Sequence, residues 1–410
     1  MMRANEAIVI RGVGAASALG FEDAGYATAG PAFSARDFAP PGVRLPVAAV
    51  PAEIERALTH LRTEPGLRVL DRAALLAVLA ARRAVAAAGW ATDSDVPTAI
   101  PRPPIAVGIG SSRGATGRLE DAFVEFMTEG RATPNTSPLT TPGNLAAAVA
   151  HDLVRRGEAV AAAVSHSSTC SSALQALGTG LAWLKAGLAD RYLAGGTEAP
   201  LTAFTVAQLR AVGIYSGLSA DEWPCRPGQA GAVANTFVLG EGAAVFALER
   251  AVPRAGDCVL SAVGFGFEQA ASRTGITPDG RHFQQAMRHA LRLAGRDSAD
   301  IDAIILHAPG TLAGDAAEVA AVRTVFGESA PALLSNKWLL GHTLGAAGAL
   351  SVEFAWWLLR NPASAAPPAP FAGFLTAAAV PFRPLRCVLV NAAGFGGNAA
   401  SALVELVGNA

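Results

Sequence analysis

Three side chains, Cys170, His307 and His342, could together perform acyl-transfer chemistry. A thiolate attacks an acyl thioester and then holds the acyl group as a thioester of its own. Two neutral imidazoles could donate hydrogen bonds to a developing enolate oxygen and assist the loss of CO2. Both histidines lie in glycine-containing turns with the small neighbours that an open site needs. Another histidine, His166, is at best near the site, and the remaining four are expected to be structural: His60, His151, His282 and His289.

The surroundings of Cys170 predict a strand, a tight turn and a helix. The apolar run 159–164 indicates a buried strand, and the apolar-periodic segment 173–186 indicates a helix that ends before Gly187. A cysteine at a helix N-terminus faces free N–H groups and the positive end of the helix dipole, which favour the nucleophilic thiolate. Because buried structural cysteines are common, this segment alone leaves both interpretations open.

Composition indicates a well-buried globular protein. The chain has 410 residues, of which 51% are hydrophobic and 16% charged, and its net charge of -1 gives no reason to expect nucleic acid or an anionic membrane as partner. The longest charge-free stretch, 159–184, is too polar to span a membrane. The four cysteines are far apart and form no CxxC pair, so neither a metal site nor a disulfide framework is indicated. The N-terminus lacks the apolar core of a signal peptide. We therefore expect a cytoplasmic protein.

The order of elements repeats once along the chain. Each part, 1–250 and 251–410, shows buried strands alternating with helices, which predicts α/β layers over mostly parallel sheets. The strands are expected at 7–10, 105–110, 159–164, 192–196 and 238–248, and then at 259–266, 301–306, 333–336, 387–390 and 402–406. We interpret Gly12 to Gly14 as a strand exit and 131–142 as a loop.

Duplication would bring the three reactive groups together. Two similar halves packed about a pseudo-two-fold axis place corresponding loops in the middle, and Cys170 and His342 precede matching helices. His307 follows a strand of the second half. Lys337 lies five residues before His342 in an apolar segment, with Glu318 as its plausible carboxylate partner.

The motifs match a family. The chain resembles the elongating β-ketoacyl-acyl-carrier-protein synthases of the thiolase superfamily essentially from end to end. The fold that this implies is thiolase-like, with duplicated α/β halves in a five-layered αβαβα architecture. The motifs that carry the resemblance are Thr169 to Ala173, Gly240 to Ala243, His307 to Thr311 with Gly314, Asp315 and Glu318, Lys337, Gly341 to Gly348, and Asn391 to Asn398.

The resemblance implies a decarboxylative Claisen condensation. Cys170 would accept an acyl chain from a carrier protein, while His307 and His342 would bind the malonyl thioester and stabilise its enolate. Lys337 and Glu318 would support His307. The backbone N–H groups of Cys170 and Phe395 would form an oxyanion hole, and the Phe395 side chain would gate the acyl pocket. Thr311 would contact the phosphopantetheine arm, which arrives on the acyl carrier protein, so that no metal or free cofactor is needed.

Two departures from the family pattern point to a specialised branch. The family usually has His-Gly-Thr-x-Thr, whereas this chain has Ala308 and Pro309 in place of the glycine and the first threonine. Proline has neither a hydroxyl nor an N–H group, so the arm must be bound differently there. The charged residues that usually follow Arg226-Pro227 are missing. Both features favour polyene or other polyketide-type lipid assembly over housekeeping fatty-acid synthesis.

Other members of the superfamily fit less well. A catalytically silent chain-length factor or a scaffold would not need Cys170, His307 and His342. A degradative thiolase needs a second cysteine in a C-terminal glycine loop, but Cys387 lies on the strand before that loop. A priming synthase would use Cys-His-Asn.

Family members dimerise through the strand before the cysteine helix, so we expect a homodimer or a heterodimer with a ketosynthase or chain-length-factor paralogue. We expect Phe204, Phe237 and 123–127 to contribute to the acyl pocket.

Overall fold

The fold consists of two halves with the same strand order. The computed structural model describes residues 3, 5–22, 26, 32–38, 42–91, 102–270, 272, 275–327, 331–361, 369–375 and 384–408. The first half orders its strands β1 (Ala7–Ser17), β8 (Gly242–Ala251), β7 (Arg191–Glu198), β5 (Ile105–Gly110) and β6 (Val160–His166). The second half orders its strands β9 (Cys258–Phe267), β13 (Asn398–Leu406), β12 (Cys387–Gly394), β10 (Ala303–Ile305) and β11 (Ala332–Leu334). In each half the first strand along the chain pairs with the last, and the third lies at the far edge.

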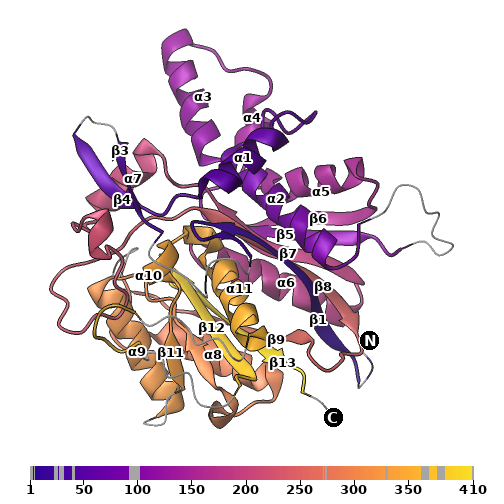
Figure 1. The fold of residues 1–410 in the computed structure, drawn as a ribbon, viewed down its shortest axis with the longest axis vertical. Helices are drawn as coiled ribbons and strands as arrows, with labels where there is room; N and C mark the ends of the chain where they lie inside the picture. Colours follow the sequence, from indigo (N-terminus) through magenta and orange to yellow (C-terminus); the bar gives the residue numbers. More distant parts are fainter. Residues whose placement is uncertain are drawn as a thin grey trace.

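Helices and sheets alternate in five layers, as predicted (Figure 1). The outer face of the first half is covered by α1 (Ala52–Leu61), α2 (Arg72–Ala87) and α5 (Asn144–Arg155). The central layer holds α6 (Ser172–Ala186) and α11 (Ala347–Arg360), which contact each other and both halves of the sheet. The last layer holds α8 (Arg281–Ala294) and α9 (Leu312–Phe326). The duplication therefore places the N-termini of α6 and α11 at the centre of the molecule.

Several elements lie outside these layers. The short strand β2 (Gly20–Phe21) extends β1, and a hairpin is formed by β3 (Ser34–Phe38) and β4 (Val43–Val47). The helix α3 (Thr116–Glu129) projects away from the body of the protein, with α4 (Thr136–Thr140) beside it (Figure 1). The remaining α-helices of the described residues are α7 (Ala203–Ala211) and α10 (Lys337–Leu340), and three short 3-10 helices cover Ala220–Glu222, Ser298–Asp300 and Leu344–Ala346.

The prediction of mostly parallel strands is confirmed, since in each half only β8 or β13, the second strand from the centre, runs against the other four. Two other expectations about this architecture were wrong. The strand β6 is not buried, because it forms the edge of the sheet and leaves Ala161 and Ala163 exposed. The segment 131–142 is not all loop, since it contains α4.

The glycines of β1 allow a helix to pack closely, contrary to their interpretation as a strand exit. The strand continues past Gly12 and Gly14 to Ser17. A Cβ atom added at Gly14 would overlap the Ala80 carbonyl oxygen of α2 and lie 2.6 Å from the Ala84 nitrogen. Glycine is required at this position because the helix backbone itself touches the strand.

We predict that Gly14→Val lowers the free energy of unfolding by about 1–3 kcal/mol, since α2 must move to accommodate the new side chain. Chemical denaturation measures the change. Gly217→Val is the matched control, because an added Cβ there meets nothing within 4 Å. Equal stability of the two variants would contradict the close packing.

Candidate active site

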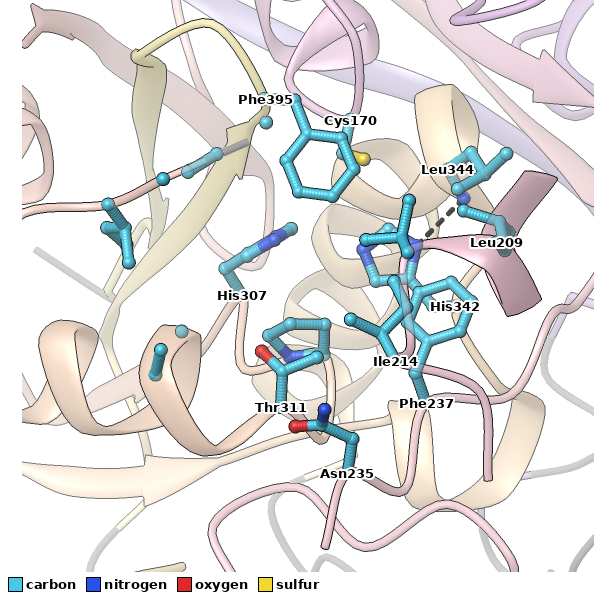
Figure 2. Close-up of a pocket in the computed structure, with 18 of the residues that line it drawn as sticks. Cys170, Leu209, Ile214, Asn235, Phe237, His307, Thr311, His342, Leu344 and Phe395 are labelled. Carbon is cyan, nitrogen blue, oxygen red and sulfur yellow. Dashed lines mark hydrogen bonds between the residues drawn. The ribbon is translucent and has the colours of Figure 1, made fainter. Parts of the chain in front are cut away.

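The turn that carries Cys170 is locked to the second half of the protein. Thr169 has a φ of 50°, which is uncommon for a β-branched residue. Its Oγ1 donates a hydrogen bond to the Phe395 carbonyl oxygen at 3.2 Å. A Cβ added at Gly394 would overlap that same hydroxyl. The two loops therefore interlock, and this contact places Phe395 beside Cys170 (Figure 2).

His342 is held in one tautomer. Its backbone N–H donates to the Val238 carbonyl oxygen at 2.8 Å, and its Nδ1 accepts a hydrogen bond from the Leu344 N–H at 3.0 Å (Figure 2). Burial, with the charge of Lys337, lowers the pKa of His342 to about 3. The imidazole is therefore neutral at pH 7, and since Nδ1 accepts a hydrogen bond, the ring proton lies on Nε2.

His307 is positioned through its backbone. Glu318 accepts hydrogen bonds from the N–H groups of His307 at 2.8 Å and Ala308 at 2.7 Å. On the preceding residue, the Leu306 carbonyl oxygen accepts a hydrogen bond from Lys337 Nζ at 3.0 Å. The predicted direct partnership of Lys337 and Glu318 is corrected: no ion pair joins them in the described residues, because each is occupied by the peptide groups flanking His307.

The two imidazoles meet edge to face. The His307 and His342 ring centroids are 5.1 Å apart with an interplanar angle of 86°. Burial, reinforced by His342 and Lys337, lowers the pKa of His307 well below its usual value. Both rings are therefore hydrogen-bond donors without net charge at neutral pH.

One cavity of about 300 Å³ is lined by Cys170, His307 and His342 (Figure 2). The expected convergence of a thiol and two imidazoles is thus present in the structure. Thr311 also lines the cavity, as does Phe395, whose side chain is 41% exposed. Further lining residues are apolar and come mainly from the segment around α7: Leu209, Val212, Ile214, Phe237 and Leu344.

Of the residues predicted to contribute to the acyl pocket, Phe237 lines the cavity within this chain. Its side chain is buried. Phe204 is exposed at the start of α7, and Phe123 and Met127 are exposed on the projecting helix α3. Because the predicted acyl pocket draws side chains from both subunits, their contribution to it stays a prediction.

The surroundings of Cys170 oppose the thiolate that a helix N-terminus favours. Burial raises the pKa of Cys170 to about 12, and the carboxylate of Glu198 raises it further, against the opposing charge of Lys337. Glu198 is fully buried and accepts hydrogen bonds from Ser111 Oγ at 2.8 Å and the Gly345 N–H at 2.8 Å. Cys170 itself lies just before the first turn of α6.

Sequence reasoning missed His282 as a residue of the site. It was set aside as structural, yet it is buried, lines the cavity and places Nδ1 at 3.0 Å from Glu268 Oε2. No motif marks this pair, because the two residues come from different elements on either side of the turn before α8.

No helix of the described residues is long and apolar enough to cross a membrane.

We predict that alkylation of Cys170 by iodoacetamide accelerates by about tenfold for each unit between about pH 7 and pH 9, because the reactive thiolate remains a small fraction of the thiol. The rate is measured by intact mass, with Cys170→Ser as the control for reaction at other cysteines. A plateau reached by about pH 8 would contradict a raised pKa.

Two family models match the chain, one over each of its two halves. Residues 59–253 match the model of the Beta-ketoacyl synthase N-terminal domain, and residues 258–367 match that of the C-terminal domain. A 3-oxoacyl-[acyl-carrier-protein] synthase 2 from Staphylococcus aureus is 32% identical over 295 residues, which cover 70% of each chain. A Streptomyces halstedii relative with polyketide beta-ketoacyl synthase in its name is 32% identical over 309 residues, or 72% of this chain and 70% of the relative.

Solved structures share the fold over nearly the whole chain. The ishigamide ketosynthase/chain length factor structure has a TM-score of 0.83 at 24% identity and covers 99% of this chain and 100% of that one. A ketosynthase structure in complex with its chain length factor, from Xenorhabdus doucetiae, has a TM-score of 0.77 at 25% identity, with 98% of both chains covered. The interlocked cysteine turn, the two neutral imidazoles and these similarities agree: the chain belongs to the beta-ketoacyl synthase family.

Proposed function

We propose that this chain is a β-ketoacyl-acyl-carrier-protein synthase that condenses a Cys170-bound acyl group with a malonyl thioester. The observation that carries the proposal is the pair of neutral imidazoles facing one cavity with the Cys170 thiol. Neutral donors suit a reaction in which an enolate oxygen gains charge and CO2 leaves. The relatives named 3-oxoacyl-acyl-carrier-protein synthase support the same reaction class.

In the first half-reaction, the Cys170 sulfur attacks the acyl thioester of the carrier arm. A bond forms between sulfur and the acyl carbon, the bond to the arm's sulfur breaks, and the cysteine proton ends on the released arm thiol. The N–H groups of Cys170 and Phe395 would hold the oxyanion, since their two loops are interlocked through Thr169. Opening of the Phe395 loop would admit the chain.

In the second half-reaction, His307 and His342 would donate hydrogen bonds to the malonyl thioester oxygen. The bond to the carboxylate breaks, CO2 leaves, and the electron pair forms the enolate. The enolate carbon then attacks the carbonyl carbon of the Cys170 thioester, the carbon–sulfur bond to Cys170 breaks, and the released thiolate takes up one proton from solvent. Because Nδ1 of His342 is occupied by the Leu344 N–H, its Nε2 proton is the donor available to the substrate.

The phosphopantetheine arm would enter along the wall that carries Thr311. No metal or free cofactor is required by these steps, since the arm arrives on the carrier protein. Pro309 lines the same wall and offers neither a hydroxyl nor an N–H group, so Thr311 alone remains of the two threonines that the family uses there. This altered wall and the relative named for polyketide synthesis favour a polyene or polyketide-type branch.

We infer a paired assembly through β6. In the described chain β6 is an edge strand with exposed alanines, and exposed edges pair readily with a second strand. The partner would be an identical chain or a chain-length-factor paralogue, as in the complex named for the Xenorhabdus doucetiae ketosynthase. The exposed apolar residues of α3, including Phe123, would lie in such an interface. The four free cysteines fit a cytoplasmic location.

We predict that Cys170→Ala abolishes both acylation and condensation, because no other thiol faces the cavity. Intact mass spectrometry of the enzyme measures acylation, and the amount of 3-oxoacyl-carrier product measures condensation. His151→Ala, at an exposed position on α5, is the control and should behave as wild type. Normal acylation of Cys170→Ala would disprove the proposal.

We predict that His307→Ala retains acylation within about threefold but lowers condensation by about a hundredfold or more, because the imidazole serves the enolate and not the thiol. Single-turnover assays separate the two half-reactions. An equal loss in both would contradict the separate role of His307.

We predict that Ala161→Lys with Ala163→Lys separates the assembly, since like charges would face each other across paired edges. Light scattering distinguishes a pair from a single chain of 41.6 kDa. Val233→Lys, at a position 93% exposed, is the control. Assembly that survives the double substitution would exclude β6 as the pairing surface.

A further inference from the structure

A buried carboxylate and imidazole lie behind the cavity and have no role in the steps above. Glu268 directly follows β9, and His282 is in the first turn of α8. Glu268 is 6% exposed and His282 is 2% exposed, and His282 Nδ1 lies 3.0 Å from Glu268 Oε2. Burial of ionisable groups is unfavourable unless partners compensate them. In the described residues His282 Nδ1 makes no hydrogen bond, so its short contact with the carboxylate depends on a constrained arrangement of the two side chains.

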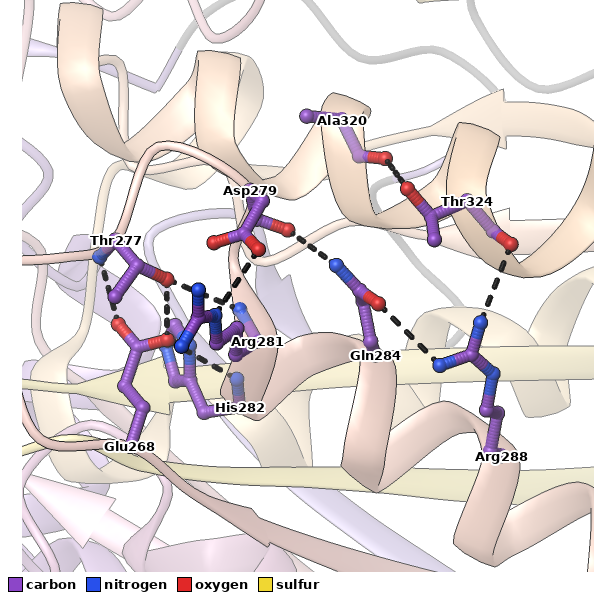
Figure 3. A network of polar contacts seen from close by, with 9 residues as sticks. All are labelled: Glu268, Thr277, Asp279, Arg281, His282, Gln284, Arg288, Ala320 and Thr324. Atoms are coloured by element: carbon purple, nitrogen blue, oxygen red, sulfur yellow. Dashed lines mark hydrogen bonds and ion pairs between the residues drawn. The ribbon is translucent and has the colours of Figure 1, made fainter.

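The Glu268 carboxylate organises the turn that leads into α8 (Figure 3). It accepts hydrogen bonds from the Thr277 N–H at 2.8 Å, the Thr277 hydroxyl at 2.6 Å and the His282 N–H at 3.2 Å. The same turn supplies Gly275 and Ile276 to the cavity lining. One wall of the cavity is therefore tied to this carboxylate.

The Glu268 backbone holds a second stretch of the cavity lining. Its N–H donates to the Gly397 carbonyl oxygen at 3.0 Å, and a Cβ added at Gly397 would overlap the Glu268 carbonyl oxygen. Gly397 belongs to the loop that carries Phe395, and both residues line the cavity. The same residue thus fastens the 275–277 turn with its side chain and the Phe395 loop with its main chain.

His282 extends this arrangement toward His307. The His282 ring centroid lies 4.4 Å from that of Phe283, and the Phe283 centroid lies 6.1 Å from that of His307. Both His282 and Phe283 line the cavity. Displacement of His282 would therefore reach the ring of His307 through one intervening aromatic side chain.

We propose that Glu268 and His282 form a positioning pair for condensation, whose side chains fix the 275–277 turn of the cavity wall and, through Phe283, the ring of His307. The proposal rests on the proposed function for its catalytic consequence. Cys170 is held separately, by the Thr169 contact and the start of α6, so the pair acts on the malonyl half-reaction and much less on acylation.

The test measures amide hydrogen exchange and enzymatic activity in the 410-residue chain. The variants are Glu268→Gln, which keeps size but removes the charge, and His282→Phe, which keeps a ring but removes Nδ1. Arg281→Gln is the matched control, because Arg281 belongs to the same network but pairs with Asp279 at the surface. Hydrogen–deuterium exchange reports on peptides covering 275–282 and 394–397.

We expect exchange at 275–282 to accelerate at least tenfold in both variants, with the control unchanged. Exchange at 394–397 should change much less, because the Glu268 main chain holds that loop in either variant. Condensation should fall at least tenfold while acylation of Cys170 stays within about threefold. Unchanged exchange at 275–282 in Glu268→Gln would overturn the proposal, and so would equal losses in both half-reactions. A wild-type protein that does not condense would instead refute the proposed function, while the exchange result would still decide whether the pair orders the 275–277 turn.

Discussion

The contact between the cysteine turn and the glycine loop of the second half is the constraint on which the site depends. Thr169, in an uncommon backbone conformation, meets Gly394 so closely that no larger residue fits, and bonds to the carbonyl of Phe395. Strain of this kind persists only where surrounding structure enforces it. Here the enforcement comes from the duplicated fold, which brings the N-termini of α6 and α11 together at the centre.

Burial then determines the electrostatics of the site. Excluding water lowers the pKa of His307 and His342 and raises that of Cys170, so all three groups rest uncharged. The charge of Lys337 further lowers the pKa of both histidines. Together with Glu318, Lys337 also fixes the main chain around His307. The site is neutral at rest, and charge develops only as the enolate forms. Its hydrogen bonds therefore stabilise the transition state more than the ground state.

Much of this was predictable from the sequence, because the motifs and the repeated order of elements are encoded locally. The helix after Cys170 and the meeting of His307 and His342 followed from periodicity and from the two-fold relation of the halves. Periodicity cannot distinguish a buried strand from an edge strand of similar composition, which is why β6 was misjudged. The Glu268–His282 pair depends on a tertiary contact that no local pattern specifies.

The most direct test of the account uses wild-type enzyme acylated in advance on Cys170 and mixed with malonyl-carrier protein carrying ¹³C in its free carboxyl group. The account predicts one labelled CO2 for every 3-oxoacyl-carrier product, with the enzyme thiol returned unmodified. Product that retains the label, or an acyl-enzyme that persists without condensation, would contradict it.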